Sequence, residues 1–113
     1  MPKFKPSWIC SRQIESHSVR PGFSSVKVHL PPLPDSVASN YDRFDIEWRR
    51  LESNAWEKTN TTASSSSITL QEELEDGSYE VRVRAAGDSG QSLYTTALRF
   101  LLLSRGKKSR LSH

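Results

Sequence analysis

The chain has 113 residues, a length that suits one domain built around a single hydrophobic core. Its 35% hydrophobic and 26% charged residues are typical of a folded globular domain and exclude a disordered chain. No run approaches the 18 apolar residues of a membrane-spanning helix, and the N-terminus lacks the apolar core of a signal peptide. We therefore expect one soluble folded unit with no transmembrane segment.

The formal net charge of +3 is distributed unevenly along the chain. Residues 1–20 carry +3 and residues 105–113 carry +4, so the part between them carries −4. A basic groove for nucleic acid is therefore not indicated, and no specific nucleic acid is expected as a partner. We predict an N-terminal tail (1–5), a folded domain (6–104) and a basic C-terminal tail or linker (105–113).

Alternation of apolar and polar residues predicts β-strands along most of the chain. The first strand is expected around Trp8 to Ile14. Two clearer strands follow at "SSVKVHL" and "RFDIEWRRL", separated by "PPLPDSVASNYD", in which the prolines break the strand pattern. The polar stretch "NAWEKTNTT" is a candidate edge strand, and Trp56 within it is expected to lie partly exposed.

The second half of the chain contains its strongest strand signal. "SSSSITL" enters a strand, Gly77 marks a tight turn, and "YEVRVRA" alternates over seven residues. "AGDSGQS" then predicts a hairpin that leads into "LYTTALRFLLL". The pattern predicts an all-β fold, a seven-stranded antiparallel sandwich of two sheets. The residues predicted to be buried in its core are Val26, Val28, Leu30, Phe44, Ile46, Trp48, Ile68, Leu70, Tyr79, Val81, Val83 and Phe100.

From Phe23 to Phe100 the chain resembles a fibronectin type III domain. "SVKVHLPP", "FDIEWR" and "LEDGSYEVRVRAAGDSGQS" are similar, in this order, to the second, third and sixth strands of that family. The resemblance implies that Tyr79 is a tyrosine corner, with its hydroxyl bonded to a backbone group just upstream. It also implies that Leu30 stands where the family usually has a tryptophan, so that Trp48 supplies the missing aromatic volume. Another immunoglobulin-like sandwich is the alternative.

The polar face of the strongest strands is a candidate partner contact. In the fibronectin type III family the third strand neighbours the sixth. The resemblance therefore implies that Glu47 and Arg49 lie beside Glu80, Arg82 and Arg84, with Arg99 beyond them on the seventh strand. Opposite charges on neighbouring strands stabilise a sheet only slightly. This face is therefore either a solvated charge ladder that prevents edge pairing or a surface for a protein partner.

The hairpin tip Gly87-Asp88-Ser89 has two interpretations. Some fibronectin-like domains carry Arg-Gly-Asp on this loop, but here Ala86 stands in place of the arginine. Without the guanidinium, half of the chemistry that recognises an integrin is lost. Glycine and aspartate are ordinary turn residues, so a plain hairpin tip is favoured, with Asp88 and Ser89 kept as candidate partner contacts.

The sequence offers no support for catalysis, a metal site or a cofactor. The three histidines have no metal-ligand spacing, and the single Cys10 can neither complete a zinc site nor form an intramolecular disulfide. Cys10 with His17 is the only candidate pair of nucleophile and base, and we do not expect it to react. Asn60-Thr61-Thr62 fits the acceptor pattern for N-glycosylation, which matters only in a secreted chain.

We therefore expect a non-catalytic binding or spacer module of a larger modular protein, monomeric as an isolated domain, with a protein partner. Cell-surface or extracellular placement is favoured. The alternative is an intracellular or membrane-proximal adaptor whose basic ends contact acidic lipid or nucleic acid.

Overall fold

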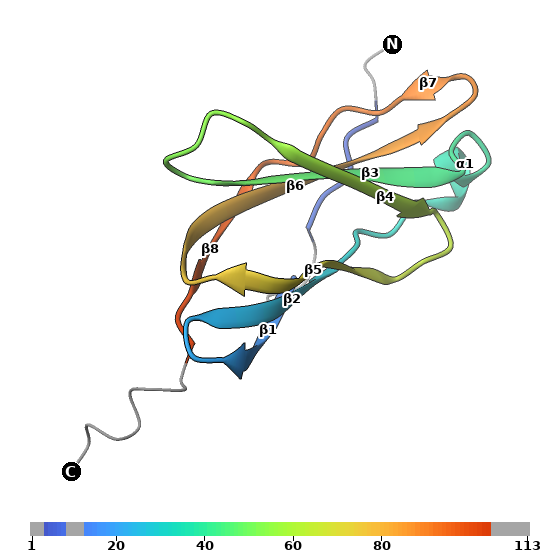
Figure 1. Cartoon of the computed structure of the whole chain (residues 1–113). Coiled ribbons are helices and arrows are strands. Elements are labelled where there is room, and N and C mark those ends of the chain that lie inside the picture. The colour runs from blue at the N-terminus through green and yellow to red at the C-terminus, as the bar shows by residue number, and fades with distance from the viewer. Residues whose placement is uncertain (1–3, 9–12, 105–113) are drawn as a thin grey trace.

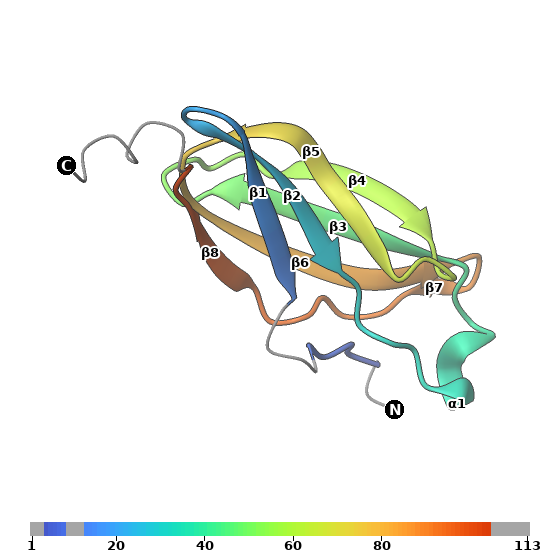
Figure 2. The same cartoon turned by 90° about the horizontal axis from the view of Figure 1, so that it is seen from below.

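The computed structural model describes residues 4–8 and 13–104, and their fold is two antiparallel β-sheets packed face to face (Figure 1). The three-stranded sheet has the order β1-β2-β5. Its strands are β1 (Ile14–Arg20), β2 (Phe23–His29) and β5 (Ser67–Glu75). The view from below in Figure 2 places this sheet over the second, five-stranded sheet.

The five-stranded sheet is built around the longest strand of the described residues, β6 (Gly77–Gly87). On one side β6 pairs with β3 (Arg43–Arg50), which in turn pairs with the edge strand β4 (Glu57–Thr62). On its other side β6 pairs with both β7 (Gly90–Gln91) and β8 (Leu98–Leu102). The single helix among the described residues, α1 (Asp35–Ala38), lies in the proline-rich connection between β2 and β3.

This arrangement confirms the predicted antiparallel two-sheet sandwich. The predicted seventh strand is divided into β7 and β8, so the described residues contain eight strand segments. Both segments pair with β6 along the same edge, and the division is a local break that leaves the sheet order unchanged.

The first strand was predicted around Trp8 to Ile14, but β1 begins at Ile14, where the predicted strand was expected to end. Trp8 lies outside any strand. Residues 9–12, which include Cys10, lie outside the described residues. The pattern missed β1 because Ser16 and Ser18 follow Ile14 on one face of the strand, so no apolar alternation marks it. Pairing with β2 defines this strand, with Ile14 opposite Val28.

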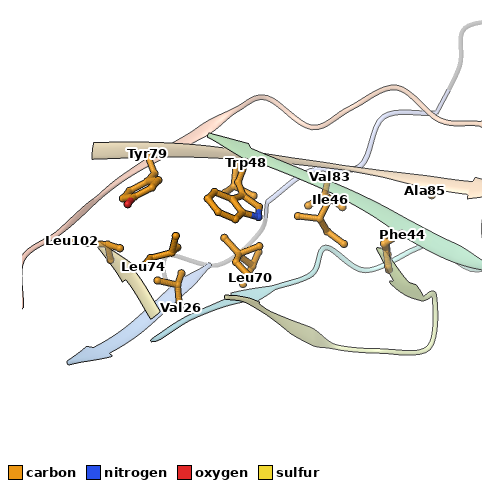
Figure 3. Close-up of a cluster of buried hydrophobic side chains, with 12 residues drawn as sticks. Val26, Phe44, Ile46, Trp48, Leu70, Leu74, Tyr79, Val83, Ala85 and Leu102 are labelled. Carbon is orange, nitrogen blue, oxygen red and sulfur yellow. The ribbon is translucent and has the colours of Figure 1, made fainter. Parts of the chain in front are cut away.

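The core lies between the two sheets (Figure 3). Nine of the twelve residues predicted to be buried are buried, and the other three, Leu30, Ile68 and Phe100, are half-buried against the core. Leu30 follows the last residue of β2, and Phe100 lies on the outermost strand, so each has fewer neighbours than a central residue. Leu74 and Leu102 were not predicted to be buried, and they complete the end of the core near Tyr79.

Tyr79 and Trp48 fill the centre of this end of the core, with ring centroids 6.2 Å apart. The Tyr79 hydroxyl donates to the Glu75 carbonyl at 2.5 Å and accepts a hydrogen bond from Arg50 Nη1 at 2.9 Å. Gly77, between Glu75 and Tyr79, has a φ of +153°, a backbone conformation that L side chains rarely adopt. Glycine is therefore favoured where the chain passes from β5 in one sheet to β6 in the other.

Candidate interaction surface

The outer face of the five-stranded sheet carries a row of directly opposed charges. The register of β3 and β6 pairs Asp45 with Arg84, Glu47 with Arg82, and Arg49 with Glu80. We call these six residues the charge ladder. Side chains two residues apart on a strand share a face, so one register places all three pairs on the same surface.

An ion pair joins the two residues of each opposed pair in the charge ladder. Arg82 approaches Glu47 Oε1 with two nitrogens, Nε at 2.9 Å and Nη2 at 2.5 Å. Arg49 does the same to Glu80 Oε2, with Nε at 2.7 Å and Nη2 at 2.6 Å. Paired guanidinium nitrogens hold the plane of each arginine more firmly than a lysine ammonium would.

The carboxylates of the charge ladder lie deeper than the guanidinium groups. The Glu47 side chain is 10% exposed and the Arg82 side chain 32% exposed. Burial alone would raise the pKa of Glu47, but hydrogen bonds from Arg82 and Tyr94 and the charges of Arg82 and Lys58 hold this pKa below its ordinary value. The surface presented to solvent is therefore made of guanidinium groups above neutralising carboxylates.

Two aromatic rings complete this surface. The guanidinium carbon of Arg82 lies 4.2 Å from the centroid of Trp56 and 4.3 Å from that of Tyr94. Arg49 also contacts the ring of Trp56, at 5.0 Å, and Arg84 contacts the ring of Tyr94, at 4.9 Å. We call these five residues the arginine–aromatic stack. Each arginine in it has both a carboxylate partner and an aromatic partner, which restricts its movement.

The break between β7 and β8 places Tyr94 in the stack. Ser92 and Thr95 bond through their backbone N–H groups to the carbonyls of Ala85 and Val83, at 2.8 and 2.7 Å. Their hydroxyls in turn accept the N–H groups of Ala85, at 2.8 Å, and Val83, at 3.0 Å. Ser92 and Thr95 are three residues apart, whereas their bonded partners Ala85 and Val83 on β6 are two residues apart. The segment therefore contains one extra residue relative to β6, as in a β-bulge. The bulge turns Tyr94 towards the outer face, where burial and the neighbouring Glu47 carboxylate raise the pKa of its hydroxyl.

Sequence reasoning did not identify Tyr94 or Trp56 as part of this surface. Neither lies on a strand, since Trp56 precedes β4 and Tyr94 lies between β7 and β8. The available signal was the hydroxyl residues Ser92 and Thr95 beside Tyr94, which can replace strand hydrogen bonds with side-chain ones.

The other two candidate contacts, Asp88 and Ser89, lie at the exposed tip between β6 and β7. They line a separate hollow of about 220 Å³ with the segment from Ser39 to Asp42. Gly87 allows this segment to approach, because a Cβ there would lie 2.6 Å from the Asn40 carbonyl oxygen. The tip therefore packs on the β2–β3 connection and does not line the charge ladder.

The N-terminal segment packs beside the bulge. The Leu93 N–H donates to the Phe4 carbonyl at 2.9 Å, and Trp8 Nε1 donates to the Thr96 carbonyl at 2.9 Å. Phe4 also stacks on Tyr41, with ring centroids 6.2 Å apart. Phe4 belongs to the range predicted as a tail, and these contacts attach it to the sandwich.

Across residues 4–8 and 13–104, no group of three or more His, Cys, Asp or Glu side chains is arranged to hold a metal ion. Over the same ranges no helix has the length and apolarity needed to cross a membrane.

The sequence matches no protein-family model and no curated protein. Solved structures do match the fold. A fibronectin type III domain of human collagen XX is 14% identical with a TM-score of 0.61, covering 90% of this chain and 98% of that one. A structure described as a myokine is 19% identical with a TM-score of 0.61, covering 91% and 99%. The sixth fibronectin type III domain of human fibronectin type III domain containing protein 3 is 11% identical with a TM-score of 0.56, covering 92% and 89%.

Proposed function

Because the chain has the fibronectin type III fold, we propose that it is a non-catalytic, protein-binding module of a larger cell-surface or extracellular protein. Domains of this fold serve in general as binding or spacer modules. The proposed contact surface is the arginine–aromatic stack, with Asp88 and Ser89 as a second, peripheral contact.

The observation that carries the proposal is that three partly exposed arginines are each held by two partners. The side chains of Arg49, Arg82 and Arg84 are 25%, 32% and 30% exposed, yet each is held by a carboxylate and an aromatic ring. Arginine, tryptophan and tyrosine dominate the energetics of protein interfaces. Side chains that are already ordered lose little conformational entropy on binding.

The chemistry of this surface fits a protein partner with hydrogen-bond acceptors. The carboxylates of the ladder already neutralise the arginines, so a strongly anionic partner would gain little from added charge. The guanidinium edges can instead donate to backbone carbonyls or to isolated carboxylates, while Trp56 and Tyr94 contact apolar groups. We expect selective binding to a protein with weak dependence on salt.

Site-specific photo-crosslinking tests this proposal. A photo-reactive amino acid replaces Trp56 in the protein that contains this chain, displayed on cells, and a matched variant carries it in place of Lys27. Lys27 is exposed and lies on β2 in the other sheet. We expect a discrete adduct from position 56 that is absent from position 27 and is reduced by Arg49→Ala. Equal adducts from both positions, or none from position 56, would overturn the proposed contact surface.

A further inference from the structure

Asn60 lies on the same outer face as the charge ladder. It belongs to the edge strand β4, pairs through its backbone with Asp45, and is exposed. Within the described part of the chain its side-chain amide has no hydrogen-bond partner. The acceptor pattern Asn60-Thr61-Thr62 is therefore carried by an amide that is available for modification.

Beside Asn60 the surface contains a hollow of about 240 Å³. Lys58 and Asn60 form the side of the hollow that belongs to β4. Asp45 and Glu47 on β3 supply its carboxylates. Arg84 and Tyr94 lie on the far side, over β6, so the hollow spans two strand spacings, roughly 10 Å.

We propose that this hollow is the seat of the first sugar of an N-linked glycan on Asn60. An N-acetylhexosamine carries hydroxyl and amide groups that both donate and accept hydrogen bonds. The lining provides both kinds of partner, donors from Lys58 and Arg84 and acceptors from the carboxylates of Asp45 and Glu47. Because the sugar is tethered at the rim, its effective concentration in the hollow is high, and weak contacts suffice to hold it.

The modification needs a donor of defined chemistry. An oligosaccharide joined to a lipid through a diphosphate supplies the sugar. Nδ2 of Asn60 bonds to C1 of the sugar and loses one proton to the solvent. The bond from C1 to the diphosphate oxygen breaks, and the lipid diphosphate leaves with the electron pair. This inference rests on the proposed function only in that the chain must enter the secretory pathway to meet this donor.

A seated glycan has two consequences for the proposed contact surface. It covers Arg84 and Tyr94 at one end of the arginine–aromatic stack and leaves Trp56 and Arg49 at the other end free for a partner. It also blocks the exposed edge of β4, which could otherwise pair with a strand of another chain.

The test uses the full chain secreted from a eukaryotic host behind an added signal peptide, so its result does not depend on where the parent protein resides. Intact mass of the wild type and of Asn60→Gln gives the occupancy of Asn60. The rate at which a peptide-N-glycosidase removes the glycan from the native protein then reports how strongly the hollow holds the first sugar.

The matched control moves the glycan to another edge strand of the same sheet. In an Asn60→Gln background, Arg99→Asn with Leu101→Thr creates an acceptor pattern on β8, where the Arg99 side chain is 74% exposed. If one hydrogen bond of typical net strength holds the seated sugar, its release from Asn60 should be about fivefold slower than from the β8 site. Lys58→Ala and Tyr94→Phe should each raise the rate of glycan release from Asn60 towards the rate at the β8 control site.

Four outcomes would overturn the inference: an unoccupied Asn60, equal release from Asn60 and the β8 site, slow release unaffected by both lining substitutions, or release that stays slow from denatured protein. Each is separate from a failure of the proposed contact surface, which is measured by crosslinking from position 56. A slow release from denatured protein would show that the enzyme, and not the hollow, limits the rate.

Discussion

The guanidinium carbon of Arg82 lies 4.3 Å from the ring centroid of Tyr94, although the two side chains come from a regular strand and from a break in its neighbour. Arg82 is at the same time paired with Glu47, and this same carboxylate is near enough to Tyr94 to help raise the pKa of its hydroxyl, after the larger effect of burial. The three groups therefore form one unit, in which loss of any member changes the surroundings of the other two.

Thr95→Val should destabilise the fold through the backbone of β6. The hydroxyl of Thr95 accepts the buried N–H of Val83, and valine has nearly the same shape without an acceptor. Leaving this N–H unpaired should cost about 1–3 kcal/mol of unfolding free energy. Urea denaturation measures the loss, and hydrogen exchange should become faster at the Val83 amide. Ser89→Ala, at an exposed position, is the control and should change neither quantity.

Arg82→Lys should cost about 1–2 kcal/mol although the charge is kept, because lysine cannot stack its head group between two rings or pair with two nitrogens. Tryptophan fluorescence should also change as Trp56 loses its neighbour. Arg99→Lys is the matched control, since Arg99 is 74% exposed and approaches Glu80 only to 3.9 Å. Equal stability losses for the two variants would contradict a special role for the stack.

Tyr79→Phe should lower the unfolding free energy by about 1–2 kcal/mol, since the hydroxyl both donates to Glu75 and accepts from Arg50. The ring itself would stay in the core. Thermal or urea denaturation provides the measurement. Tyr41→Phe serves as the control because Tyr41 is half-buried and contacts Phe4 through its ring. An unchanged midpoint for Tyr79→Phe would mean that water replaces both bonds without loss.

The lowered pKa of Glu47 predicts an acid-dependent part of the stability. The stabilisation is fully present above the ordinary value of 4.5 and is lost as the pH falls through the lower pKa of the folded state. Glu47→Gln removes it, so the variant should be less stable than the wild type near neutral pH, and the difference should shrink as the pH falls below 4.5. Urea denaturation midpoints measured over this pH range report the effect. Glu72→Gln, at an exposed position, is the control and should show the same pH dependence of stability as the wild type.

The alternation from Tyr79 to Ala85 and from Phe44 to Trp48 was enough to predict the two central strands and their inner faces. A period of two is a local property of a strand with one face in a core, so no tertiary information is needed to detect it. The succession of strands along the chain, the turn at Gly77 and the hairpin at "AGDSGQS" likewise follow from local patterns, whereas the neighbours of each strand in the sheets were implied by the resemblance to fibronectin type III domains. For these reasons the antiparallel sandwich itself was predictable.

Other features depended on the packing of distant segments. The family resemblance implied that Glu47 lies near Arg82, 35 residues away, but only the register of β3 with β6 decides that the two are directly opposed. Tyr94 reaches Arg82 because a bulge opposite β6 adds one residue, a displacement that alternation cannot predict. Phe100 is half-buried because its strand is the outermost of its sheet. The sequence by itself thus determined which faces are apolar, whereas the tertiary structure decided which charges and rings meet, since those contacts are set by pairing across strands that are far apart in the chain.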